Sequence, residues 1–229
     1  MLQRHADWFS LLNVDPALRD RSRDVMEQTL KISQGMMHRM DVEALAAALL
    51  HCQPKRVFEI GTYRGASSEM MLRLLPEAEV ISIAFVSEAQ GKRQFNNDEL
   101  SVEDVGALVS PENRGRYTQL IGDSHQIDPA AFVRTHGRMD LVFIDGDHSR
   151  EGVRQDTTLA RAILADGGAI AWHDANPKKR YIGSRLFLEE DLDELALATS
   201  DDFIGGVALW TSALEQQLRA GTLAMAGKP

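Results

Sequence analysis

The sequence predicts an α/β fold in which a mostly parallel sheet is covered by helices on both faces. From residue 56 onward, short runs of β-branched and apolar residues alternate with helical patterns. This alternation is typical of buried parallel strands joined by helices. The chain has 229 residues, of which 44% are hydrophobic. Such a length suits one large domain with its own core.

Two helical patterns precede the first predicted strand. Residues 17–36 place apolar side chains at three- and four-residue spacings among charges, which indicates an amphipathic helix. Asp41 is a candidate N-cap for the helix VEALAAALLHC, which Pro54 follows. We therefore predict an N-terminal helical extension over residues 1–40, a main domain over 41–212 and a C-terminal tail over 213–229 whose last residues are frayed. An N-terminal helix of this kind is typical of a homodimer contact.

The main domain contains six predicted strands with helical patterns between them. The strands are 56–60, 79–85, 116–121, 139–144, 168–173 and 206–210, and the helical patterns lie near 66–75, 129–135, 150–164 and 181–198. The stretch 87–115 is the least regular part of the chain. It is either a lid over a site or a loop that carries one helix.

Composition excludes several classes of partner. The net charge of −9 argues against binding to a phosphate backbone, so no nucleic-acid partner is expected. No stretch approaches the roughly 20 apolar residues that cross a bilayer, and the charged start MLQRHADWFSLL does not fit a secretory signal. The single cysteine, Cys52, indicates a reducing compartment. We expect a cytoplasmic protein with no membrane contact.

A glycine loop follows the first strand of the main domain. In FEIGTYRGAS, Gly61 and Gly65 bracket a tight turn, and Ser67 lies in the first turn of the following helix. Glu59 precedes the loop, where a dinucleotide fingerprint has no acid and a third glycine. An acid here favours a ligand with a cationic ammonium group over one with a pyrophosphate. The alternative is a purely structural turn capped by a glutamate.

Carboxylates and imidazoles follow three further strands, at the edge where parallel sheets bind ligands. The residues are Asp123, Ser124 and His125 after 116–121, Asp145 and His148 after 139–144, and His173 and Asp174 after 168–173. Asp145, His173 and Asp174 form a candidate site for a divalent cation such as Mg²⁺ or Mn²⁺. His148 is the candidate general base, because an imidazole titrates near neutral pH. The alternative for the three candidate metal ligands is that they are helix caps and hydrogen-bonded polar groups without a metal. The alternative for His148 is an ordinary surface histidine.

These stretches together resemble the class I S-adenosylmethionine-dependent methyltransferases. The similarity is strongest to the small-molecule O-methyltransferases of the catechol O-methyltransferase and macrocin type. It extends over residues 41–210, and its matching stretches are FEIGTYRGAS (58–67), LIGDSHQ (120–126), LVFIDGDHSREGVRQD (141–156) and ADGGAIAWHDAN (165–176). The resemblance implies a Rossmann-like methyltransferase fold with a mostly parallel seven-stranded sheet.

The resemblance also implies roles for individual residues. The cofactor, S-adenosylmethionine, would be held by Glu59, Gly61, Thr62, Tyr63, Gly65, Ser67, Asp123, Ser124 and Asp145. Asp145, His173 and Asp174 would bind the divalent cation, and His148 with Asp145 would be catalytic. His125 would line the nucleoside pocket. The implied reaction transfers the cofactor's methyl group to a hydroxyl of a small molecule such as a sugar, polyol or catechol.

One position departs from the family pattern. Relatives end the second strand with an acid that hydrogen-bonds the ribose hydroxyls, whereas this chain has Ala84, with Glu88 four residues later. Losing such a contact costs about 1.5–3 kcal/mol of cofactor binding. Ala84 keeps open a second hypothesis, a non-catalytic or cofactor-altered descendant that acts as a binding domain. A nicotinamide-dependent oxidoreductase is disfavoured by Glu59, by the missing third glycine and by Ala84.

Overall fold

Eight strands form the main sheet among the residues that the structure describes. The computed structural model describes residues 2–5, 7–86, 93–95, 98–175, 182–192, 197–200 and 206–221. The strand order is β1-β9-β10-β8-β7-β2-β3-β6. The strands are β1 (Leu2–His5), β2 (Arg56–Ile60), β3 (Glu79–Ala84), β6 (Tyr117–Ile121), β7 (Met139–Ile144), β8 (Leu164–Trp172), β9 (Leu197–Ser200) and β10 (Ala208–Thr211). A separate hairpin pairs β4 (Arg93–Phe95) with β5 (Asp98–Leu100).

The sheet confirms the predicted parallel α/β architecture. The five adjacent strands β8, β7, β2, β3 and β6 run parallel to one another, whereas β10 is antiparallel to both β8 and β9. All six predicted strands are present, and β9 is the seventh strand that the family resemblance implied. The eighth strand, β1, adds to the edge in parallel with β9.

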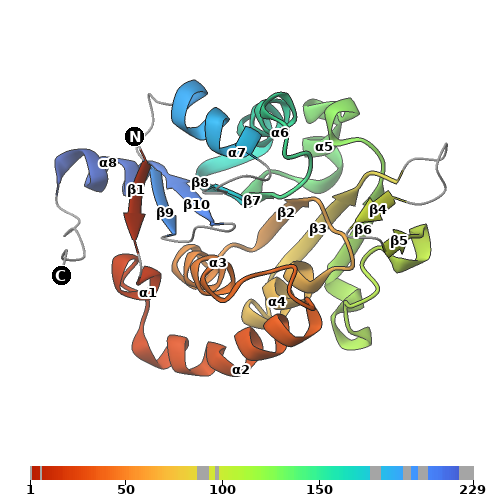
Figure 1. Cartoon of the computed structure of the whole chain (residues 1–229), viewed down its shortest axis with the longest axis horizontal. Coiled ribbons are helices and arrows are strands. Elements are labelled where there is room, and N and C mark those ends of the chain that lie inside the picture. Colours follow the sequence, from red (N-terminus) through yellow and green to blue (C-terminus); the bar gives the residue numbers. More distant parts are fainter. Residues whose placement is uncertain are drawn as a thin grey trace.

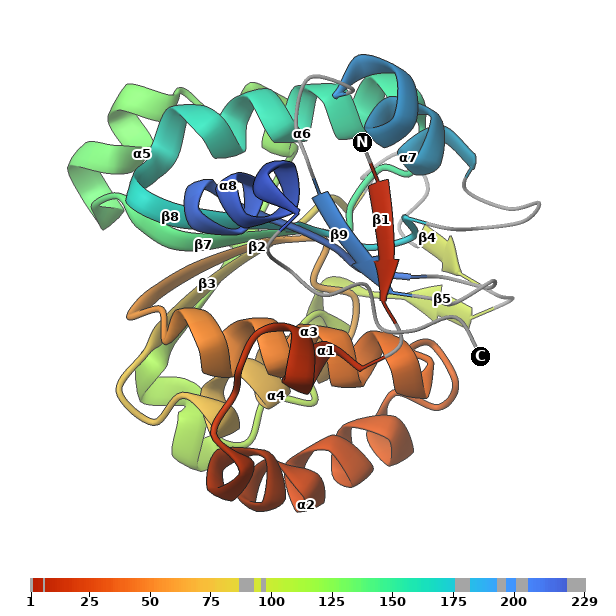
Figure 2. The same cartoon turned by 90° about the vertical axis from the view of Figure 1, so that its left-hand side faces the viewer.

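Helices cover both faces of the sheet (Figures 1 and 2). Helices α1 (Trp8–Leu11), α2 (Pro16–Ile32), α3 (Arg39–Cys52) and α4 (Ala66–Leu74) lie on one face, and α5 (Pro129–His136), α6 (Arg150–Ile163) and α7 (Ile182–Leu186) on the other. One π-helical turn (Phe187–Asp191) continues α7, and α8 (Ser212–Ala220) follows β10. Short 3₁₀ turns occupy Val102–Asp104, Pro111–Arg116 and Ser124–Gln126.

Local capping explains where several helices begin. Asp15 and Asp128 accept hydrogen bonds from the backbone N–H groups of Ala17 and Ala130, and a proline follows each cap. Ser149 accepts from the N–H of Gly152 and starts α6. Helix α3 is different from the prediction. Its N-cap is His38, and Asp41 lies in the first helical turn instead of at the cap.

Two other predictions need correction. The predicted helix over 181–198 ends with the π-turn, and residues 197–198 belong to β9. The N-terminal extension contains a strand, β1, as well as helices. The predicted C-terminal tail begins with α8, which Thr211 caps, and residues 222–229 lie outside the described residues.

The core has two parts, one on each face of the sheet. The first gathers apolar side chains of α1–α4 over the sheet and includes the fully buried Leu45 and Leu49 of α3. The second lies under α5–α7 and includes Phe58 and Trp172, which are buried. These layers leave the carboxyl ends of the strands open at one edge. In the described ranges, no helix has the length and apolar character needed to span a bilayer.

Candidate functional site

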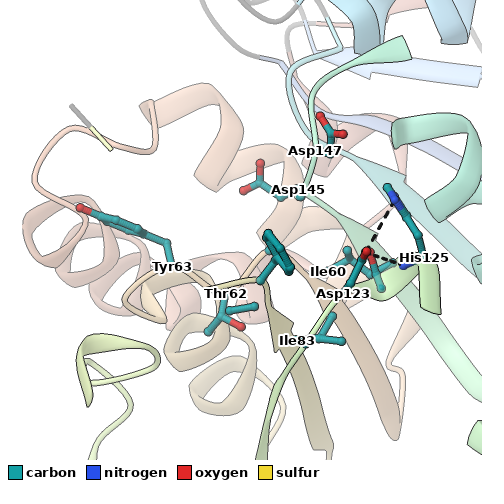
Figure 3. Close-up of a pocket in the computed structure, with 14 residues that line it drawn as sticks. Ile60, Thr62, Tyr63, Ile83, Asp123, His125, Asp145 and Asp147 are labelled. Atoms are coloured by element: carbon teal, nitrogen blue, oxygen red, sulfur yellow. Dashed lines mark hydrogen bonds and ion pairs between the residues drawn. The ribbon is translucent and has the colours of Figure 1, made fainter. Parts of the chain in front are cut away.

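A pocket of about 330 Å³ opens at the carboxyl ends of β2, β3, β6 and β7 (Figure 3). Parallel α/β sheets bind ligands at this edge. The lining is apolar on β2 and β3 and acidic on β6 and β7. It consists of Ile60, Gly61, Thr62, Tyr63, Ile83, Ala84, Phe85, Gly122, Asp123, Ser124, His125, Asp145, Gly146 and Asp147. Figure 3 shows Asp145 beside Asp147, with Asp123 next to His125.

The glycine loop is shaped by its contact with the end of β7. Gly61 has φ +105°, and a Cβ added there would lie 2.0 Å from the carbonyl oxygen of Asp145. Backbone pairing continues across this contact, since the Asp145 N–H donates to the Ile60 carbonyl over 2.8 Å. Glycine is therefore required at position 61 by the neighbouring strand. Tyr63, two residues later, has φ +47°, which is uncommon for a non-glycine residue.

Glu59 lies behind the glycine loop and does not line the pocket. Its side chain is completely buried and accepts hydrogen bonds from the hydroxyls of Ser67, Ser68 and Ser82, the last over 2.6 Å. Burial raises the pKa of Glu59 to about 7, although the three hydroxyls oppose the shift. The serine contacts hold this carboxylate beneath the loop, and its role toward a ligand ammonium group stays a prediction.

The described part of the irregular stretch 87–115 contacts the glycine loop through backbone hydrogen bonds. The N–H groups of Gly106 and Leu108 donate to the carbonyls of Tyr63 and Arg64, over 3.1 and 2.9 Å. A Cβ on Gly65 would lie 2.9 Å from the Cα of Gly106. Residues 101–116 therefore form a fixed wall beside the loop, with 3₁₀ turns in place of the one helix considered from the sequence. Residues 87–92 and 96–97 lie outside the described residues.

A polar cluster stands at the end of β6. The Asp123 side chain accepts from the N–H of His125 over 2.9 Å and is 37% exposed toward the pocket. Asp156 of α6, whose side chain is fully buried, accepts from the Ser124 hydroxyl over 2.7 Å and lies 3.4 Å from Nε2 of His125. Burial raises the pKa of Asp156 to about 6. The sequence reasoning did not select Asp156, although it ends one of the matching stretches.

The end of β3 carries apolar side chains. Ala84 and Phe85 both line the pocket, and Phe85 is 51% exposed. The position where relatives carry an acid therefore presents a methyl group. Glu88, the residue considered as its replacement, lies outside the described residues.

His173, at the end of β8, lies between carboxylates. Its Nδ1 is 3.0 Å from Oδ1 of Asp145, and its Nε2 is 3.3 Å from Oδ2 of Asp41. Because carboxylate oxygens only accept, both ring nitrogens must carry hydrogens for these contacts to be hydrogen bonds. Burial alone would lower the pKa of His173, but Asp145, Asp41 and Asp174 outweigh it and raise the pKa well above 6.5.

One group with metal-ligand spacing is found among the residues that the structure describes, and it consists of Asp145, His148 and Asp174. Their ligand atoms lie within 4.8 Å of one another, and Nδ1 of His148 is 3.1 Å from Oδ2 of Asp174. His148 stands in this cluster where the sequence analysis placed His173, whose ring nitrogens face Asp145 and Asp41. Asp174 has φ +52°, a strained backbone of the kind found at functional sites.

The structure brings most of the predicted site residues to one edge. Gly61, Thr62, Tyr63, Asp123, Ser124 and Asp145 line the pocket. His148, His173 and Asp174 lie beside Asp145, whereas Glu59 and Ser67 contact each other beneath the loop, and Gly65 packs against Gly106. The sequence reasoning missed Asp147 and Asp41. Asp147 lies in the quoted DGDH motif, and its carboxylate accepts from the N–H of Ser149 over 2.9 Å.

Comparison with known proteins agrees with this geometry. Residues 58–175, more than half of the chain, match a family described as "Methyltransferase domain". No protein among the curated ones matches the chain.

Solved structures share the fold at low identity. The O-methyltransferase TomG from Streptomyces achromogenes, solved with SAM, is 16% identical with a TM-score of 0.52, over 82% of this chain and 89% of that chain. The O-methyltransferase from Bacillus cereus, solved with SAH, gives 16% and 0.52 over 82% and 91%. The MycE methyltransferase of the mycinamycin biosynthetic pathway, solved with Mg and SAH, gives 16% and 0.52 over 90% and 56%. The chain belongs to this family of methyltransferase domains and has the Rossmann-like α/β fold of these O-methyltransferases.

Proposed function

We propose that this chain transfers the methyl group of S-adenosylmethionine to a hydroxyl group of a small molecule. The observation that carries the proposal is the pocket at the strand ends of a methyltransferase domain, with Asp145, His148 and Asp174 at one side. The relatives solved with this cofactor or its product support the choice of cofactor.

The pocket suits this cofactor better than a dinucleotide. Three of its lining residues are aspartates, and none of the lining residues that the structure describes is lysine or arginine. An anionic pyrophosphate would meet repulsion there, whereas a sulfonium and an ammonium group would be attracted. The apolar side chains of Ile83, Ala84 and Phe85 offer contact to a nucleobase. When bound, S-adenosylmethionine supplies an electrophilic methyl group to the acceptor oxygen.

His148 is the proposed base for the acceptor hydroxyl. A carboxylate on one ring nitrogen fixes the tautomer and orientation of an imidazole, and Oδ2 of Asp174 lies 3.1 Å from Nδ1 of His148. The acceptor proton would then pass to the histidine ring. Asp145 lies at the pocket wall, where it would contact the cofactor, as the resemblance implied, and accept a hydrogen bond from the acceptor hydroxyl.

The same three side chains fit a divalent cation, which gives the proposal a metal-assisted form. Asp145, Asp174 and His148 would hold the ion. A bound Mg²⁺ or Mn²⁺ would lower the pKa of a coordinated hydroxyl. In that form His148 is a ligand and not the base, so metal removal distinguishes the two forms.

Cofactor binding is the first test. Calorimetric titration with S-adenosylhomocysteine should show binding, and no binding at millimolar concentration would contradict the proposal. Nicotinamide dinucleotides should give no heat in the same experiment. Binding of the nicotinamide instead would favour an oxidoreductase.

Methyl transfer is the second test. The protein is incubated with tritiated-methyl S-adenosylmethionine and a panel of sugars, polyols and catechols, with and without EDTA and Mg²⁺. Replacement His148→Ala should lower the rate about 10²–10⁴-fold. The control His51→Ala removes an exposed histidine at the end of α3 and should leave the rate unchanged. If the rates of methyl transfer are equal in His148→Ala and His51→Ala, the result would support a non-catalytic chain or a base other than His148.

A further inference from the structure

Asp41, which the sequence suggested as a helix cap, is a fully buried carboxylate next to the site. It has no exposed surface, although it lies in the first turn of α3, near the start of the main domain. A buried carboxylate is costly unless donors surround it. Its donors therefore indicate what the side chain does.

Three donors from separate parts of the chain meet this carboxylate. Oδ1 accepts from the N–H of Gly206, just before β10, over 2.8 Å. Oδ2 accepts from the N–H of His38 over 3.4 Å and faces Nε2 of His173 at 3.3 Å. Burial would raise the pKa of Asp41, but His173 and these N–H groups outweigh it, and the net shift is downward. A helix cap alone would need only the contact with His38.

The His173 ring connects this carboxylate to the pocket. One ring nitrogen faces Asp41, and the other lies 3.0 Å from Oδ1 of Asp145. The ring is itself buried, packs edge-on against Phe143 with centroids 6.3 Å apart, and its backbone N–H donates to the Ile144 carbonyl. With an acceptor at each nitrogen and apolar packing at its edge, the ring has one well-defined orientation.

We infer that Asp41 is a positioning residue that acts through the His173 ring to fix Asp145 at the wall of the pocket. This inference rests on the proposed function for the role of Asp145. It places the start of α3 within the machinery of the site. The contact spans 132 positions of sequence between Asp41 and His173, so no local motif contains it.

A double-mutant cycle tests the inference. S-adenosylhomocysteine affinity is measured for the wild type, Asp41→Asn, Asp145→Asn and the double variant. Asp41→Asn should weaken binding about fivefold or more, and adding it to Asp145→Asn should cause no further loss, because both act on the same contact. Asp140→Asn is the matched control. Asp140 also accepts two backbone N–H groups, each over 2.9 Å, but at the opposite end of β7.

The outcomes separate the inference from the proposed function. Full additivity of the two losses would show that Asp41 acts only on the stability of α3, and the inference would be wrong. An equal loss of S-adenosylhomocysteine affinity in Asp140→Asn would also show that the inference is wrong. If the wild type does not bind the probe, the proposed function fails, and the cycle is repeated on the free energy of unfolding. Coupling between positions 41 and 145 then supports the inference, and additivity overturns it.

Discussion

The pH dependence of stability should report the burial of Glu59. Its carboxyl is fully buried, and its pKa is raised from 4.5 to about 7. Below pH 4.5 the folded and unfolded chains both hold the proton. Between pH 4.5 and 7 the folded chain keeps a proton that the unfolded chain releases, so stability falls as the pH rises, and above pH 7 the loss is complete.

The magnitude follows from the difference between the two pKa values. A shift from 4.5 to about 7 is 2.5 pH units (7 − 4.5), which corresponds to about 3 kcal/mol of unfolding free energy. In Glu59→Gln the side chain does not titrate. The free energy of unfolding of the wild type, minus that of Glu59→Gln, should therefore fall by about 3 kcal/mol between pH 4.5 and 8.

Urea denaturation of both proteins at half-unit pH steps measures this difference. Other buried acids, such as Asp156 with its pKa of about 6, are present in both proteins and cancel. Ser82→Ala removes one of the three donors to Glu59, so it should move the decline to higher pH. A difference between wild type and Glu59→Gln that does not change with pH would refute the reasoning, because Glu59 would then titrate alike in both states.

Three substitutions test the surrounding structure. Gly61→Ala should destabilise the fold by about 2–6 kcal/mol in urea denaturation, because it adds a Cβ 2.0 Å from the Asp145 carbonyl oxygen at a residue with φ +105°. An unchanged midpoint of urea unfolding would contradict the loop geometry. Trp172→Phe should cost about 2–4 kcal/mol in the same assay, since the buried indole donates to Thr157 over 2.9 Å. Ala84→Asp should tighten S-adenosylhomocysteine binding about tenfold or more by calorimetry, if a carboxylate there reaches the ribose hydroxyls; weaker binding would exclude that geometry.

The sequence predicted β2, β3, β7 and β8 because each contains a buried apolar run, whereas β6, at the edge of the sheet, is only partly buried. Strand β9 has no such signal. Its four residues, LATS, extend a helical pattern, and pairing with β10 and β1 makes them a strand. Tertiary pairing decides such a segment, because local propensity is weak over four residues. The strand β1 at the chain start escaped prediction for the same reason.

The acids at the strand ends could be predicted because carboxyl ends of parallel strands meet at one edge. The direction in which each of these side chains points could not be predicted. Glu59 pairs in register with Ser82 on β3. Since alternate residues of a strand point to opposite faces, both side chains face the helices α3 and α4, where Ser67 and Ser68 complete the cage. That outcome depends on strand register and helix packing, which one sequence does not display.

The donors of the buried acids determine which charges a ligand meets. Glu59 is caged by serines, Asp156 is held by Ser124, and the side chain of Asp174, 8% exposed, faces His148. Asp123 and Asp145 keep 37% and 24% of their side-chain surface exposed at the pocket. The field in the pocket therefore comes mainly from these two carboxylates and from Asp147, which is exposed and also lines the pocket. Such a field favours a ligand that carries positive charge, as a sulfonium nucleoside does.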